Sequence, residues 1–251
     1  MFYQATLTKG GQGRRMSLDI PGLLEEVRRR VLDELPNVQN RRYDVMWKDD
    51  GSPVTAADVY LEGIISSYLR DRLDNLTFIG EESWVAGDDC PQGWCAVLDP
   101  IDGTENFCSG LKEWGVSLSV WHDQKHAGSL LMMPELGEAL SSGNISYVPR
   151  SRIVGFSSSY HPAIGDGLSS TPEGRIMGCA VYNLFNVIRG SFSRFVNPKG
   201  ARSWDLLAGV ALAREAGCEV FVDDKQYDGH FLKPDQRYRV DIRHRYDLHT
   251  R

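Results

Sequence analysis

The sequence lacks the long apolar runs and the cysteine pairs that mark membrane-spanning and disulfide-bonded proteins. No segment reaches the about 18 consecutive apolar residues that a transmembrane helix needs. The five cysteines are an odd number and include no C-x-x-C pair, so we expect reduced, buried thiols. Because the beginning of the chain has no apolar stretch typical of a secretory signal peptide, we expect a cytoplasmic protein.

The chain also lacks an excess of basic residues. It has 28 Lys and Arg against 34 Asp and Glu, and the formal net charge of −6 argues against binding to nucleic-acid polymers or anionic membranes. An anionic small molecule is still compatible with this charge, because a bound cation can reverse the local field. The hydrophobic and charged fractions, 41% and 25%, are those of an ordinary globular domain.

Neither internal repeats nor a linker rich in Pro, Gly or Ser divides the chain. Residues 1–16 include a segment rich in Gly, Lys and Arg that lacks the G-K-[ST] ending of a phosphate-binding loop, so we expect a flexible tail there. We expect residues 17–251 to form a single fold with two sub-regions, at about residues 17–150 and 151–245. The six histidines show no H-E-x-x-H spacing, and we interpret them as structural or exposed residues.

The periodicity of apolar residues predicts a mixture of helices and strands. Helical spacing favours helices over residues 21–35, 55–73, 179–189 and 203–217, the last with Ser203 as its N-cap. Apolar runs favour strands at residues 77–80, 94–98, 116–120, 128–133, 153–157, 192–196 and 218–222. We expect strand 94–98 to be buried on both faces and to end abruptly before Asp99, and strand 116–120 to be half-buried. The mixture indicates an α/β or α+β fold with several strands in hairpin order.

Two acids follow the predicted buried strand directly. Asp99 and Asp102 are separated by Pro100 and Ile101, and Gly103 permits a tight turn after them. Close carboxylates repel each other unless they are protonated or bridged by cations. The Ile101 carbonyl lies between them and can supply a third oxygen, and such hard oxygen ligands suit Mg²⁺. By itself, Asp-x-x-Asp is a weak signal and is more typical of a solvated turn than of a metal site.

Further acids stand at the ends of other predicted elements. Glu81 and Glu82 follow a short strand, and Asp205 lies in the first turn of a helix, where the helix dipole stabilises any carboxylate. Asp58 stands three residues after Thr55, in the form of a capping box. Each of these acids also has an ordinary structural explanation, and only their arrangement points to a shared site.

The arrangement resembles the inositol monophosphatase family of Mg²⁺-dependent, lithium-sensitive phosphatases. The matching segments are Val54-Thr55-x-x-Asp58, Gly80-Glu81-Glu82-Ser83, Asp99-Pro100-Ile101-Asp102-Gly103-Thr104 and Trp204-Asp205-x-x-x-Gly209. The resemblance covers roughly residues 23–222 and implies a layered αβαβα sandwich of the inositol monophosphatase/fructose-1,6-bisphosphatase type. It also implies a homodimer that hydrolyses the phosphate monoester of a small polyol, inositol or sugar phosphate by metal-activated water.

The resemblance implies two or three bound Mg²⁺ ions. Glu81, Asp99 and the Ile101 carbonyl match the ligands of the first ion. Asp99, Asp102 and Asp205 match the ligands of the second, with Asp99 bridging the two ions. A third, weaker ion would share Glu81, which we therefore place among the catalytic residues as well.

Other residues match the family's water-activating and substrate-binding positions. Asp58 and Thr104 resemble the pair that orients and deprotonates the attacking water. Gly103 and Thr104 would offer backbone N–H groups to the phosphate. Cys179 and Ala180 resemble the segment that contacts the substrate, beside the metal ligand Asp205.

The sequence departs from the inositol-specific pattern near the substrate. Glu105 stands where those enzymes usually carry Thr, and the stretch before Trp204 lacks the acid that binds ring hydroxyls. That stretch carries Lys199 and Arg202 instead, which could bind a second phosphate or a carboxylate, or could be solvated loop cations.

Three alternatives to an inositol or sugar phosphatase therefore stay open. Two are enzymes of the same chemistry, a 3′(2′),5′-bisphosphate nucleotidase and a histidinol-phosphate phosphatase. The third is a metal-binding interaction protein that has lost turnover.

Overall fold

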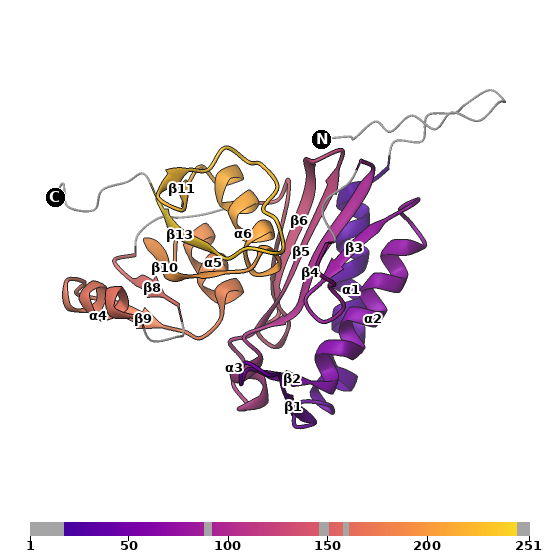
Figure 1. The fold of residues 1–251 in the computed structure, drawn as a ribbon, viewed down its shortest axis with the longest axis horizontal. Helices are drawn as coiled ribbons and strands as arrows, with labels where there is room; N and C mark the ends of the chain where they lie inside the picture. Colours follow the sequence, from indigo (N-terminus) through magenta and orange to yellow (C-terminus); the bar gives the residue numbers. More distant parts are fainter. Residues whose placement is uncertain (1–17, 88–91, 146–150, 158–160, 245–251) are drawn as a thin grey trace.

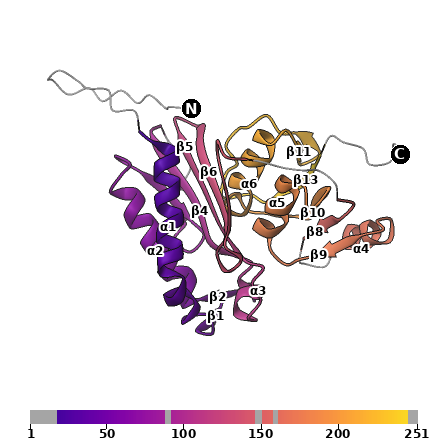
Figure 2. The same cartoon turned by 180° about the vertical axis from the view of Figure 1, so that it is seen from behind.

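The computed structural model describes residues 18–87, 92–145, 151–157 and 161–244. The tail expected at residues 1–16 lies outside the described part of the chain. Helices and sheets alternate in layers along the long axis of the molecule, as Figures 1 and 2 show from opposite sides. Among the described residues, no helix is long and apolar enough to cross a lipid bilayer.

The first sheet has five strands in the order β3-β4-β5-β6-β7. They are β3 (Thr77–Gly80), β4 (Trp94–Asp102), β5 (Gly115–His122), β6 (Lys125–Met133) and β7 (Glu138–Ser141). β3 runs parallel to β4, whereas β4 to β7 pair in sequence as antiparallel neighbours, joined after β6 by the 3-10 turn η1 (Pro134–Leu136). The outer helices α1 (Ile20–Gln39) and α2 (Ala56–Arg70) cover one face of this sheet, and a small hairpin of β1 (Val45–Trp47) and β2 (Pro53–Thr55) precedes α2 (Figure 1).

The second sheet has six strands in the order β12-β11-β13-β10-β8-β9. They are β8 (Val154–Phe156), β9 (Gly174–Ile176), β10 (Arg194–Ala201), β11 (Glu219–Val222), β12 (Lys225–Gln226) and β13 (Tyr238–Arg243). Helices α5 (Ala180–Arg189) and α6 (Ser203–Glu215) lie between the two sheets, and α4 (Pro162–Ser169) lies at the far end beside β9 (Figure 1). The predicted αβαβα sandwich is therefore confirmed.

Alternate residues of the first sheet belong to two hydrophobic cores. Cys95 and Val97 of β4 join the core shared with α5 and α6, whereas Ala96 and Leu98 join the core under α1 and α2. Burial of this strand on both faces is thus confirmed. On the inner side, α5 and α6 pack closely at Gly209, where an added Cβ would lie 2.4 Å from a Leu184 methyl carbon. A side chain at Gly209 would push the two helices apart.

Two predictions about the first sheet were wrong. β4 does not end before Asp99 but continues to Asp102, because Asp99 pairs with Ser117 and Asp102 with Gly115 across an irregularity in the register. β5 is not half-buried: Ser117 is 1% exposed, and its hydroxyl donates to the Trp204 carbonyl at 2.7 Å. A serine that finds such a partner can be buried without leaving an unpaired polar group.

The remaining differences lie at helix ends and in short elements. Arg202, and not Ser203, is the N-cap of α6, because its backbone N–H donates to the Asp205 carboxylate. α1 continues through Pro36 to Gln39, and α2 ends before the predicted boundary, at Arg70. The sequence prediction did not include α3 (Thr104–Cys108), α4, β9 or β13.

Candidate active site

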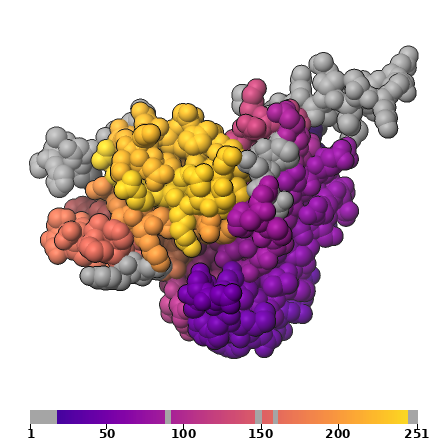
Figure 3. Space-filling model, in the orientation of Figure 1, coloured from indigo at the N-terminus to yellow at the C-terminus, as the bar shows by residue number. Residues whose placement is uncertain are grey.

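A cavity of about 980 Å³ opens between the two halves of the molecule. Its lining combines residues from the β1–β2 hairpin, the β3–β4 region and α3 with residues from β9, β10 and the segment before β13. In Figure 3 the hairpin (indigo) and the C-terminal region (orange to yellow) lie on the same face of the molecule. Both halves of the molecule therefore contribute to this face.

Three carboxylates meet at the wall of this cavity: Glu81 and Asp205 line it, and Asp99 lies buried beside them. Oxygen atoms of Glu81, Asp99 and Asp205 all lie within 4.8 Å of one another. Glu81 follows β3 and is fixed by a hydrogen bond from its N–H to the Leu98 carbonyl, at 3.0 Å. The hydrogen bond from Ser117 to the Trp204 carbonyl holds the beginning of α6 beside Asp99 on β4. Hydrogen bonds next to the acids therefore join segments that are far apart in the sequence.

Helix N-termini hold several of the predicted acids. Asp205 caps α6 through the N–H of Arg202, at 2.7 Å. Asp102 is turned toward the start of α5, where its Oδ2 accepts from the Val181 N–H and from the Cys179 thiol, the latter at 2.8 Å. Asp58 forms the predicted capping box of α2. The positive ends of α2, α5 and α6 thus stabilise a concentration of carboxylates that would otherwise repel each other.

Burial and mutual repulsion raise the pKa values of the clustered acids. Burial raises the pKa of Asp99 well above its ordinary value, and the charges of Glu81, Asp102 and Asp205 raise it further. Burial raises the pKa of Asp102 to about 6, and burial together with the neighbouring Asp102 and Glu81 raises that of Asp205 to about 7. Such a cluster favours bound protons or bound cations.

The donor set fits a hard divalent cation. Glu81, Asp99 and Asp205 present only carboxylate oxygens, and the buried Ile101 carbonyl lies on the same strand end as Asp99. Mg²⁺ prefers such oxygen ligands and takes the rest of its coordination sphere from water and substrate phosphate. Asp102 is close enough to influence Asp99 but does not belong to the tight group of three.

The predicted water-activating pair is connected by hydrogen bonds. The Thr104 hydroxyl lies 3.0 Å from the Ile101 carbonyl and 3.3 Å from Asp58 Oδ1, so its single proton can go to either acceptor. The other Asp58 oxygen accepts from the Thr55 N–H at 2.8 Å. Burial raises the pKa of Asp58 to about 6, although the hydrogen bonds from Thr55 oppose this shift. A buried carboxylate with such a pKa can exchange a proton near neutral pH.

The sequence analysis missed Lys48, which lies beside the acids. Its ammonium donates to Glu81 Oε1 at 3.0 Å and to Glu82 Oε1 at 2.9 Å. Burial opposes the charged form, but the two carboxylates outweigh it and raise the pKa of Lys48. Burial also raises the pKa of Glu82 to about 7. No motif surrounds Lys48 in the sequence, so only the hairpin geometry reveals its place.

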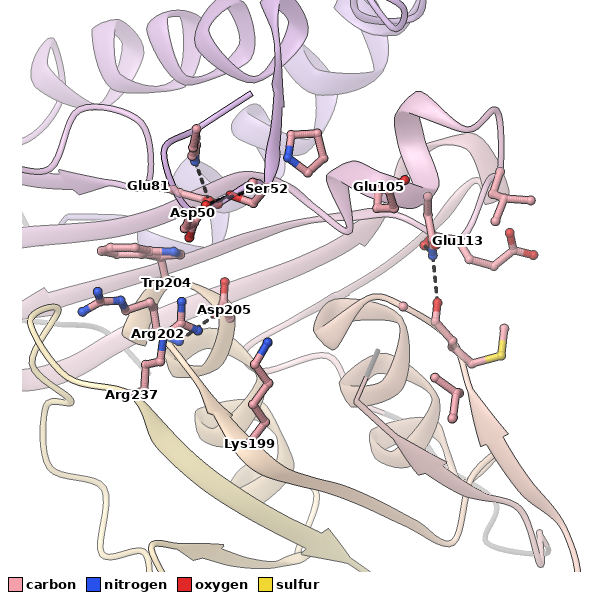
Figure 4. Close-up of a pocket in the computed structure, with 18 of the residues that line it drawn as sticks. Asp50, Ser52, Glu81, Glu105, Glu113, Lys199, Arg202, Trp204, Asp205 and Arg237 are labelled. Atoms are coloured by element: carbon pink, nitrogen blue, oxygen red, sulfur yellow. Dashed lines mark hydrogen bonds and ion pairs between the residues drawn. The ribbon is translucent and has the colours of Figure 1, made fainter. Parts of the chain in front are cut away.

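The opposite wall of the cavity is basic. Lys199 and Arg202 both line it, and Arg237, which the sequence analysis also missed, lies beside them. Figure 4 shows Lys199 extending toward Asp205, with Arg202 and Arg237 on the same side of the cavity. Arg202 donates to the Pro234 carbonyl at 3.1 Å and lies over the rings of Trp84 and Trp204.

The other predicted substrate contacts lie around the acids. Gly103 has a φ of 83°, and a Cβ there would lie 2.8 Å from the Cys179 side chain, so the turn after Asp102 requires glycine. Cys179 is the N-cap of α5, and Ala180 lines a smaller cavity next to Asp102. Glu105 is exposed on α3 and lines the main cavity.

Comparisons with known proteins agree with this geometry. The chain is similar to the inositol-1-monophosphatase of Mesorhizobium japonicum (27% identical over 212 residues, 75% of this chain and 77% of that protein). It is also similar to the fructose-1,6-bisphosphatase/inositol-1-monophosphatase of Archaeoglobus fulgidus (30% over 243 residues, 91% of each). A solved structure described as an IMPase/NADP phosphatase complexed with Mg²⁺ and phosphate shares the fold, with a TM-score of 0.75, 18% identity and 90% of each chain covered.

The family model of inositol monophosphatases matches residues 22–245, which is most of the chain. This match spans the first helix, both sheets and every acid of the cluster. The chain therefore belongs to the inositol monophosphatase family and is a phosphoric monoester hydrolase.

Proposed function

We propose that the protein is a Mg²⁺-dependent phosphatase that hydrolyses the phosphate monoester of a small metabolite. The observation that carries this proposal is the convergence of Glu81, Asp99 and Asp205, whose oxygens lie within 4.8 Å of one another. Their charges are not neutralised by an equal number of cations, since Lys48 contacts only Glu81 among the three. A divalent cation is the ligand that this arrangement favours.

Two or three ions would be held by the residues that the family resemblance indicates. Glu81, Asp99 and the Ile101 carbonyl would hold one ion, and Asp99, Asp102 and Asp205 would hold the second. Bound Mg²⁺ would neutralise the phosphate, lower the pKa of water and stabilise the departing oxygen. The full set of acids favours an enzyme over an inactive binding protein.

The chain's own residues would position the reactants and move the proton. The Thr104 hydroxyl would accept a proton from the attacking water while it passes its own to Asp58, whose Oδ1 lies 3.3 Å away. Thr55 would keep Asp58 in place through its N–H, because the capping box fixes the other carboxylate oxygen. The N–H groups of Gly103 and Thr104 would bind the phosphate oxygens.

Phosphate release by the purified protein tests this proposal. The substrates are inositol 1-phosphate, fructose 1,6-bisphosphate, adenosine 3′,5′-bisphosphate and histidinol phosphate, each with Mg²⁺, with EDTA, and with EDTA followed by excess Mg²⁺. We expect release only when Mg²⁺ is present. If no ester is hydrolysed with Mg²⁺ while the folded protein still binds the ion, the interaction-protein alternative replaces the proposal.

A further inference from the structure

Two cations of the basic wall form no direct polar contact with the described residues, although hydrogen bonds from a nearby serine and, more weakly, the charge of Arg237 lower the pKa of Asp50 in the same cavity. Lys199 and Arg237 form no hydrogen bond or ion pair in the described part of the chain, whereas Arg202 is held by Pro234 and two indole rings. Both are exposed side chains that line the main cavity. Arg202 is therefore the structural member of the wall, and the other two are available to a ligand.

The backbone places these two cations side by side. Lys199 lies in an irregular stretch of β10, where the pairing with β13 shifts its register between Asn197 and Ala201. The Asn197 side chain accepts from the Gly200 N–H at 3.0 Å and so holds this stretch in shape. An added Cβ at Gly200 would lie 3.3 Å from the Arg237 side chain, which shows how closely that arginine passes the residue next to Lys199.

Both cations also line a second, smaller cavity of about 140 Å³. This small cavity borders Asp102 and Asp205, so a group bound in it would lie directly beside the acidic cluster. The same space is thus bordered by two acids and by the two cations.

We infer that the small cavity binds the leaving group and that Lys199 and Arg237 bind a second anionic group on it. The substrate is then a hydroxylated metabolite phosphate with a second phosphate or a carboxylate. Its second anion would lie against the two cations, while the phosphate to be hydrolysed lies at the acidic cluster. This inference rests on the proposed function, because it assigns the substrate class of the same site.

Matched pairs of substrates test the inference. Fructose 1,6-bisphosphate is compared with fructose 1-phosphate, and 3-phosphoglycerate with glycerol 1-phosphate, so that each pair differs in one anionic group. We expect kcat/KM to be about tenfold or more higher for the doubly anionic member of at least one pair, because a charge-assisted hydrogen bond contributes that much. The pair that shows the preference identifies the second anion as phosphate or carboxylate.

Variants connect the preference to the two side chains. In the double variant Lys199→Met/Arg237→Met the preference should fall to about one, with kcat/KM for the singly anionic member nearly unchanged. The control is Arg239→Met: Arg239 lies two residues further along, on β13, pairs with Asp224 at 2.7 Å and lines neither cavity, so the preference should persist. Circular dichroism checks that each variant is folded.

The possible results separate this inference from the proposed function. Equal kcat/KM within both pairs, or an equal loss for both members in the double variant, would overturn the anion site. If inositol 1-phosphate is hydrolysed and neither doubly anionic substrate is, the anion site is again wrong while the phosphatase proposal stands. If no phosphate ester is hydrolysed with Mg²⁺, both fail together.

Discussion

The two walls of the cavity hold their charges in opposite ways. On the acidic wall, Asp102 and Asp205 accept hydrogen bonds from helix N-termini, and Asp99 Oδ1 accepts from the Ile101 N–H at 3.0 Å. On the basic wall, Lys199 and Arg237 extend from an irregular strand and the segment before β13 without a direct polar contact among the described residues. Figure 4 shows acids from both halves of the molecule facing these cations.

From this difference we expect the acidic wall to carry out the hydrolysis and the basic wall to select the substrate. The backbone positions the acids before any ligand arrives, so the binding of a cation costs little reorganisation. The two cations form no hydrogen bond or ion pair among the described residues, so a substrate can bind them without moving the acids. We therefore expect substitutions on the acidic wall to abolish turnover and substitutions on the basic wall to change selectivity.

The largest effect should follow Asp99→Asn. Asp99 is 1% exposed and is the acid whose pKa is raised by each of the other three, so it is central to the cluster. Loss of one charged ligand removes several kcal/mol of transition-state stabilisation, and we expect kcat/KM to fall by about a thousandfold or more. Asp102→Asn should behave similarly. Phosphate release over a range of Mg²⁺ concentrations measures both.

The fold should survive these two substitutions, because removing one of several repelling carboxylates stabilises the metal-free protein. The exposed Asp224→Asn is a suitable control, since it removes the same charge at a residue that pairs with Arg239 and lines neither cavity of the site. Full activity of either active-site variant at low Mg²⁺ would show that the acids do not bind the ion.

A smaller effect should follow Thr104→Val. This change removes the hydroxyl that lies between Asp58 and the Ile101 carbonyl but keeps the shape of the side chain. Removal of a group that transfers a proton costs roughly a hundredfold or more in kcat. Thr104→Ser should restore most of the rate, because it restores the hydroxyl. A kcat for Thr104→Val equal to that of the wild type would exclude Thr104 from the proton transfer.

The acidic wall could be predicted from the sequence because its residues lie in short motifs at element ends. Glu81, Asp99 and Asp205, which the structure brings together, were named in this way, whereas a metal-binding role of Asp102 stays a prediction. The continuation of β4 to Asp102 was missed, since proline and glycine there also suit a turn. The roles of Gly103, Cys179 and Ala180 in substrate binding stay predictions, as do the number of ions, the homodimer and the cytoplasmic location.

The basic wall could not be predicted completely. Arg237 belongs to no motif and comes beside Lys199 only because β13 pairs with β10. β13 was missed as well, although the alternation of its apolar residues with arginines and an aspartate is typical of a strand with one buried face. Lys48 was missed because its contact with Glu81 depends on the position of a short hairpin. Long-range strand pairing places Arg237, and the packing of a local hairpin beside Glu81 places Lys48, so no local sequence pattern records either position.

The smallest effect concerns stability and pH, and it distinguishes the two walls without any substrate. The pKa values of Asp205 and Glu82 are raised to about 7 and those of Asp58 and Asp102 to about 6. The folded protein therefore binds more protons than the unfolded chain, and stability falls as pH rises through these values. His126 acts in the opposite direction, since burial lowers its pKa to about 4, but its contribution is complete above about pH 6.5.

Thermal unfolding in EDTA should consequently show a melting temperature that falls by a few degrees between about pH 6.5 and about pH 8. Asp99→Asn should weaken this dependence of the melting temperature on pH, because it removes the carboxylate that the other acids repel most. The contribution of His126 is the same in both proteins and does not affect the comparison. Added Mg²⁺ should weaken the pH dependence as well, since the ion replaces the protons. Lys199→Met/Arg237→Met should keep the wild-type pH dependence, because neither cation contacts the acids. Two results would contradict this prediction: a melting temperature that rises between these pH values, or the same pH dependence in Asp99→Asn as in the wild type. Either would mean that the carboxylates of the acidic wall do not repel each other enough to lower the stability of the metal-free protein.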